Sequence, residues 1–168
     1  MLCWQSYVHQ QHLVRVTVNS IGELVISDPS FVRILVVEDF GAWRDYIVEK
    51  LRENPSLRVV DFAADGLEAV RKAQEVRPDL ILLDIGLPGL SGIEAARQIR
   101  RVVSESKIIF MTAETSAQVA EVALRLGAEG YVLKIDVDRD LLVAVQAVMS
   151  GKRFVSEHVD KRQFPPNR

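Results

Sequence analysis

Carboxylate, hydroxyl and ammonium side chains stand at the ends of four short apolar runs in this chain. Glu38 and Asp39 follow the first run, Asp84 follows the next, Thr112 ends the third, and Lys134 ends the last. Carboxylates about 4 Å apart repel by roughly 4 kcal/mol at an effective dielectric near 20, so such a cluster favours a bound cation. An oxygen-only site suits Mg²⁺. A hydroxyl and an ammonium suit an anion, so the set predicts a phosphoryl site with a carboxylate as nucleophile.

The elements that must position these side chains alternate between strand and helix from Arg33 onward. Buried runs predict strands, and apolar stripes at helical spacing between capping and breaking residues predict helices, with Asp65 and Ser116 expected as helix caps. The expected strands are 34–37, 57–62, 80–83, 107–111 and 131–133. The expected helices occupy about 43–51, 65–76, 91–103, 116–126 and 138–150. This pattern predicts an α/β, flavodoxin-like (βα)5 doubly wound parallel sheet with strand order 2-1-3-4-5. Strands one and three would then bring Glu38, Asp39 and Asp84 to one sheet edge.

Size and composition fit one such domain with additional segments at both ends. The chain has 168 residues, 48% of them hydrophobic, and a net charge of −2, so no strong basic field indicates nucleic acid binding by this chain alone. Its single cysteine and the lack of a membrane-length apolar run predict a cytoplasmic protein without disulfides or a membrane span. We expect one folded domain at 31–151, an N-terminal extension at 1–30, and a linker or tail at 152–168. The extension is either a hairpin, with strands at 13–18 and 23–26, or disordered.

Four motifs in this order resemble the receiver domain of two-component response regulators. They are Ile34-Leu35-Val36-Val37-Glu38-Asp39, Leu82-Leu83-Asp84 with Pro88 and Gly92 downstream, Met111-Thr112-Ala113, and Gly130-Tyr131-Val132-Leu133-Lys134. Each motif alone is weak, but all four at successive strand ends are a specific pattern covering residues 33–150. The resemblance implies a signalling protein that catalyses only its own phosphotransfer and slow autodephosphorylation, not a turnover enzyme.

The resemblance also implies a role for each matching residue. Asp84 would accept a phosphoryl group from a partner histidine kinase, and Asp39, Glu38 and the backbone carbonyl of Gly86 would hold Mg²⁺ together with Asp84. Thr112 and Lys134 would contact the phosphoryl oxygens. The remaining roles fall on three positions: the switch aromatic Tyr131, which would turn inward on phosphorylation, and Gly86 and Glu114, which would tune hydrolysis.

The resemblance further implies how the signal leaves the domain. The face made by the fourth helix, fifth strand and fifth helix would change its partner preference and could form a homodimer. Ile135-Asp136 stands where many receivers have a proline, as is common in regulators with a LuxR-type (NarL-type) helix-turn-helix output. DNA would then be bound, and transcription regulated, only through an output domain that does not follow before Arg168. The chain is therefore expected to be a piece of a longer regulator or a stand-alone receiver.

Each residue also has an ordinary structural explanation. Asp84 could cap a helix or form a turn, Lys134 and Glu38 could be solvated, Thr112 could cap the next helix, and Tyr131 could be a half-buried strand residue. A phosphatase with an aspartate nucleophile needs an acid two residues later, where Gly86 stands. A flavodoxin needs a hydroxyl-rich phosphate loop after the first strand. A receiver-like binding module that is never phosphorylated remains the alternative function. Phe40 is expected to be exposed at the mouth of the site.

Overall fold

The structure, a computed structural model, describes residues 15–18, 24–27 and 31–159. The chain divides into two units, Met1–Phe31 and Val32–Arg168. In the first unit, β1 (Arg15–Val18) pairs antiparallel with β2 (Leu24–Ser27). The other residues of the expected hairpin (13, 14 and 19–23) lie outside the described residues, as do Cys3 and the end of the expected tail, 160–168.

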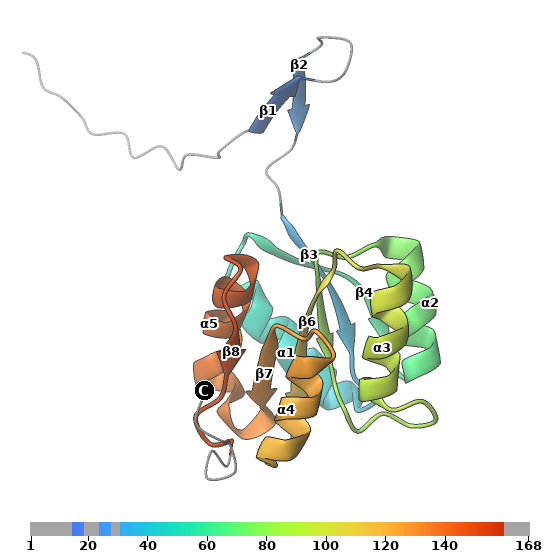
Figure 1. Cartoon of the computed structure of the whole chain (residues 1–168). Coiled ribbons are helices and arrows are strands. Elements are labelled where there is room, and N and C mark those ends of the chain that lie inside the picture. Colours follow the sequence, from blue (N-terminus) through green and yellow to red (C-terminus); the bar gives the residue numbers. More distant parts are fainter. Residues whose placement is uncertain (1–14, 19–23, 28–30, 160–168) are drawn as a thin grey trace, which may run out of the picture. The chain divides into compact units, whose positions relative to one another are not determined.

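The second unit is a parallel sheet of six strands in the order β4-β3-β5-β6-β7-β8 (Figure 1). The strands are β3 (Val32–Val37), β4 (Leu57–Ala63), β5 (Leu80–Leu83), β6 (Lys107–Thr112), β7 (Gly130–Leu133) and β8 (Phe154–Val155). The first five in chain order have the predicted order 2-1-3-4-5, which confirms the fold class. The sixth strand, β8, was not predicted and extends the sheet beside β7 from within the segment expected to be a linker or tail.

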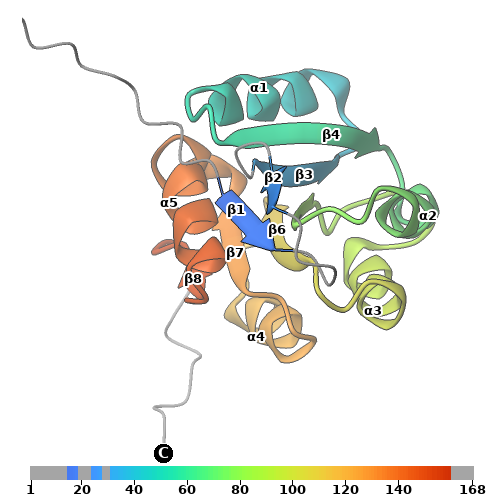
Figure 2. The ribbon, with the colours of Figure 1, turned by 90° about the horizontal axis from the view of Figure 1, so that it is seen from above.

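Helices cover both faces of this sheet, as expected for right-handed parallel crossovers. They are α1 (Gly41–Arg52), α2 (Gly66–Val76), α3 (Gly92–Val102), α4 (Ala117–Arg125) and α5 (Val137–Met149). Alternate strand residues pack against α1 and α5 on one face, and the others pack against α2, α3 and α4 on the opposite face (Figure 2). Every residue of β5 is fully buried, which explains its uninterrupted apolar sequence. Among the described residues, no helix is long and apolar enough to cross a bilayer.

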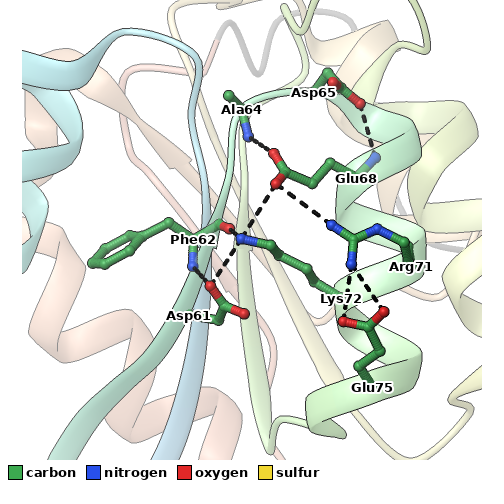
Figure 3. Close-up of polar contacts among 8 residues, drawn as sticks. All are labelled: Asp61, Phe62, Ala64, Asp65, Glu68, Arg71, Lys72 and Glu75. Carbon is green, nitrogen blue, oxygen red and sulfur yellow. Dashed lines mark hydrogen bonds and ion pairs between the residues drawn. The ribbon is translucent and has the colours of Figure 1, made fainter.

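The start of α2 is held by a polar network with the end of β4 (Figure 3). Asp65 caps the helix as predicted, because its Oδ1 accepts a hydrogen bond from the Glu68 amide at 2.8 Å. Glu68 in turn accepts from the Ala64 amide at 2.8 Å, and Lys72 reaches Asp61 Oδ1 at 2.9 Å. This network fixes the helix end that packs closely, through Gly66, against the loop following Asp84: a Cβ on Gly66 would lie 2.2 Å from the Leu90 carbonyl oxygen.

Two helix starts beside the site differ in how they are capped. At α3, the Ser91 hydroxyl accepts from the Glu94 amide at 3.4 Å. Gly92 is required there because a Cβ would lie 1.9 Å from the Asp84 carbonyl oxygen. At α4, the predicted capping by the Ser116 side chain is wrong. Its hydroxyl makes no capping hydrogen bond, and Glu114 Oε1 instead accepts from the Ser116 amide at 2.8 Å.

Candidate functional site

The carboxyl ends of β3, β5, β6 and β7 bring the predicted residues to one edge of the sheet. Glu38 and Asp39 follow β3 and Asp84 follows β5, and one oxygen of each lies within 4.8 Å of the others. Glu38 is 0% exposed and Asp84 6%, whereas Asp39 is exposed. The ordinary explanation of Glu38 as a solvated residue is therefore excluded. Asp84 does not cap α3, since Ser91 does, but its Oδ1 accepts from the Gly86 amide at 3.2 Å as in a tight turn.

Lys134 lies between the two buried carboxylates. Its Nζ is 2.7 Å from Asp84 Oδ2, to which it donates a hydrogen bond, and 2.7 Å from Glu38 Oε2. The second contact is an ion pair with a carboxylate that is completely buried. Burial of Lys134 opposes its charge, but the contacts with Asp84 and Glu38 outweigh burial and raise the pKa of the ammonium. Lys134 is thus a counter-ion for both carboxylates and not a solvated surface lysine.

The donor set fits a hard divalent cation. Burial raises the pKa of Glu38, and the neighbouring Lys134 offsets only part of that shift. Two buried carboxylates next to an exposed one form the kind of oxygen-only environment that Mg²⁺ occupies while keeping several waters. Glu38, Asp39 and Asp84 are the residues that would hold the ion here.

A cavity of about 450 Å³ opens next to Asp84 and is large enough for a phosphoryl group. It brings together Asp84 with four of the other predicted residues, and its lining is Asp84, Ile85, Gly86, Thr112, Ala113, Glu114, Val119 and Lys134. Thr112 Oγ1 accepts a hydrogen bond from the Glu114 amide at 3.1 Å, which leaves the hydroxyl proton available to an oxygen in the cavity. Thr112 therefore shapes the turn after β6, while α4 begins at Ala117.

Tyr131 is completely buried beneath the loop that follows Thr112. Its hydroxyl donates to the Glu114 carbonyl oxygen at 2.8 Å, and burial raises the pKa of the phenol. The inward position that was predicted to follow phosphorylation is thus already occupied in this structure. The described contacts join Thr112 to Tyr131 through the two backbone groups of Glu114.

Trp43 packs against the hydrophobic core and is also a neighbour of the site. Its ring centroid lies 5.7 Å from Lys134 Nζ, within the range of a cation–π contact. The ring also stacks on Tyr46 with a centroid distance of 5.2 Å, and the Tyr46 hydroxyl bonds to Asp138 at the start of α5. The signal was its position in the first turn of α1, the helix that begins directly after the acidic pair and Phe40. Phe40 is 65% exposed, as expected.

Comparisons with known proteins agree with this geometry. Residues 34–146 match the family model described as "Response regulator receiver domain". The chain is 32% identical over 128 residues to the response regulator GacA of Pseudomonas viridiflava, covering 76% of this chain and 60% of that protein. It is 34% identical over 121 residues to the transcriptional regulatory protein LiaR of Bacillus subtilis, covering 72% and 57% respectively. The chain therefore spans somewhat over half the length of these relatives.

Solved structures show the same fold. A LuxR-family two-component response regulator from Aurantimonas sp. SI85-9A1 superposes with a TM-score of 0.75 at 34% identity, covering 79% of this chain and 94% of that chain. The response regulator domain of Thermotoga maritima CheB gives a TM-score of 0.66 at 34% identity, covering 71% and 97%.

Proposed function

The chain belongs to the response regulator receiver domain family, and from that premise we propose that it accepts a phosphoryl group on Asp84 from a partner histidine kinase. The observation that carries this proposal is the position of Asp84. Its carboxylate is buried at the edge of a cavity between Lys134, Thr112 and two further carboxylates. The Lys134 ammonium and the Thr112 hydroxyl suit the phosphoryl oxygens, and the two further carboxylates suit a cation that would neutralise charge during the transfer.

The proposed transfer forms one bond and breaks one bond. An oxygen of Asp84 attacks phosphorus as the P–N bond of a phosphohistidine breaks, and the imidazole nitrogen keeps the bonding electron pair. Bound Mg²⁺, held by Glu38, Asp39, Asp84 and the Gly86 carbonyl, would supply charge neutralisation for the carboxylates and the phosphoryl oxygens. Lys134 would leave Glu38 to pair with a phosphoryl oxygen, and the Thr112 hydroxyl would donate to another.

The chemical outcome is an aspartyl phosphate and not a turnover product. Response regulators are mostly signalling proteins without enzymatic turnover, and Gly86 offers no acid to activate water. A Cβ on Gly86 would lie 3.8 Å from Asp84 Oδ2 without a clash, so a side chain at this position would stand directly beside the acceptor. Together with Glu114, which lines the same cavity, Gly86 is proposed to set the rate of autodephosphorylation.

The proposed output is a change in partner at the face formed by α4, β7 and α5. Relatives of this chain are named as transcriptional regulators. We propose that the phosphorylated domain controls transcription through a DNA-binding output domain, that a homodimer forms through this face, and that the exchange occurs in the cytoplasm, where response regulators typically act.

Incubation with acetyl phosphate and Mg²⁺, followed by intact-mass measurement, tests the proposal. One added phosphoryl group is expected, and it should be lost in Asp84→Asn and when EDTA replaces Mg²⁺. Asp79→Asn is the matched control, because Asp79 precedes the opposite end of β5 and bonds there to the Arg33 amide at 2.7 Å. Absence of modification by acetyl phosphate and by histidine kinases would instead favour a binding module that is never phosphorylated.

A further inference from the structure

The segment that follows α5, residues 152–159, is packed onto the face that was expected to exchange partners. Within it, β8 pairs parallel with β7, with Gly130 opposite Phe154 and Tyr131 opposite Val155 (Figure 1). Ser156 is 0% exposed and Val159 2%. Val159 belongs to the same core cluster as Tyr131 and the buried alanines of α4. The chain thus covers the β7 edge, between α4 and α5, with its own backbone and side chains.

The Ser156 hydroxyl fastens this segment to both β7 and α5. Its Oγ donates to Asp140 Oδ2 at 2.6 Å and accepts from the Leu133 amide at 3.1 Å, while the Ser156 amide donates to the Tyr131 carbonyl at 2.9 Å. Asp140 is itself buried and is held by Arg139 Nε at 2.7 Å. Hydrogen bonds to a buried, charged partner are among the strong ones in a protein.

A second attachment lies two residues further along. His158 Nδ1 is 2.7 Å from Asp136 Oδ1, and this carboxylate is buried at the start of α5. Arg139 also approaches the same oxygen at 3.4 Å. The segment is therefore attached to Leu133, directly before the short turn η1 (Lys134–Asp136) that joins β7 to α5, and to Asp136 at the end of that turn.

The residues that hold the segment and the site residue Lys134 lie together within positions 131–136. Tyr131 and Leu133 bond to Ser156, Lys134 pairs with the site carboxylates, and Asp136 bonds to His158. Lys134 follows Leu133 directly, so a movement of the Lys134 backbone moves the amide that Ser156 accepts from. All of these contacts are satisfied together while Lys134 rests on Glu38 and Asp84.

We infer that residues 152–159 occupy the α4–β7–α5 face as an intramolecular partner, and that phosphorylation of Asp84 releases them by drawing Lys134 away from Glu38. This inference rests on the proposed function. The Ser156 latch, defined as its bonds to Asp140 and Leu133, favours the resting position of Lys134. A second copy of the chain or an output partner can reach the β7 edge only after the latch opens. The coupling is a population shift between two packed states.

Hydrogen–deuterium exchange on the full chain, with and without beryllofluoride and Mg²⁺, tests the inference. Fluorine NMR reports separately whether beryllofluoride binds Asp84. With the analogue bound, amides of residues 154–159 and Leu133 should exchange about tenfold faster or more, as expected for loss of bonds to a charged group. Bound analogue with unchanged or slower exchange would overturn the inference and leave the proposed function standing. Failure of the analogue to bind at all would overturn both.

Ser156→Ala distinguishes coupling from mere structural support. In the variant, residues 152–159 should be more loosely packed even without the analogue. By thermodynamic reciprocity, the variant should also bind beryllofluoride more tightly, by the same factor by which analogue binding shifts the wild-type latch toward its open state. Ser150→Ala is the matched control, because the exposed Ser150 hydroxyl donates to the Gln146 carbonyl of α5 and lies outside residues 152–159. Its affinity should equal that of the wild type. Looser packing in Ser156→Ala with unchanged affinity would show a structural role only and contradict the coupling.

Discussion

Lys134→Met should reveal how much the Lys134 ammonium stabilises the resting site. Methionine keeps the length of the side chain but removes the charge that lies 2.7 Å from both Glu38 and Asp84. The two carboxylate oxygens lie no more than 4.8 Å apart, so their repulsion is at least about 3 kcal/mol at an effective dielectric near 20. Removing one partner of a buried ion pair costs a similar amount, about 3–5 kcal/mol. Since Lys134 keeps some solvent contact, we expect a loss of about 3 kcal/mol in the free energy of unfolding at pH 7 without divalent cations.

Urea unfolding in EDTA measures this loss. Adding Mg²⁺ should restore most of it, because a cation that binds only the folded state stabilises it by mass action. The variant should also bind Mg²⁺ more tightly than the wild type, since no ammonium competes for the carboxylates. Lys107→Met is the matched control. Lys107 Nζ lies 3.6 Å from Glu129, which keeps its 2.6 Å pair with Arg100, so the expected loss is about 1 kcal/mol or less.

The stability lost in Lys134→Met should depend on pH. The pKa of Glu38 is raised, and it should rise further without the ammonium, so the folded variant binds a proton more readily than the unfolded chain. The contribution of Glu38 to the free energy of unfolding is therefore fully present below its ordinary pKa of 4.5. That contribution is lost as pH rises through the raised pKa of Glu38 in the folded state. The deficit should thus be small near pH 4.5 and grow toward pH 7. The pKa of Lys134 is raised above 10.5, so its contribution in the wild type lasts through neutral pH and is lost as pH rises through that raised value. Unchanged stability in EDTA at pH 7, or a loss that Mg²⁺ does not reduce, would refute this reasoning.

Three further predictions concern residues around the acceptor. Gly86→Asn should still be phosphorylated but with a changed phosphoaspartate half-life, because the new side chain stands beside Asp84; equal half-lives in a mass time course would count against it. Gly92→Ala should lower stability by about 2 kcal/mol or more, since its Cβ would lie 1.9 Å from the Asp84 carbonyl oxygen, and a wild-type melting temperature would show that the loop can move freely. Mg²⁺ should change Trp43 fluorescence, because Lys134 leaves its place 5.7 Å from the ring; an identical Mg²⁺ response in Trp43→Phe would assign the signal elsewhere.

The site residues could be predicted from the sequence because each ends a buried strand. A run such as Leu80–Leu83 has few alternatives to a covered parallel strand, and the polar residue after it must emerge at the carboxyl edge. Asp65 was likewise predictable as a cap, because its partner Glu68 is local in sequence. Features that depend on local sequence pattern or on strand order could therefore be predicted from the sequence.

Features that depend on distant partners were not predictable in the same way. β8 has only two residues, and it is a strand because the edge of β7 is free to pair with it. Ser156 is buried because Asp140 and Leu133 meet it there, which no local pattern encodes. Ser116 has the residue type of a cap, yet the Glu114 carboxylate reaches its amide instead.

Chemical trapping of the phosphorylated residue tests directly whether Asp84 is the phosphoryl acceptor. After reaction with acetyl phosphate and Mg²⁺, borohydride reduces an aspartyl phosphate to homoserine, and peptide mass spectrometry then locates the modified position. We predict homoserine at position 84 and unmodified aspartate at position 39. Homoserine at another aspartate, or phosphorylated protein without any homoserine, would contradict the assignment of Asp84 as the acceptor.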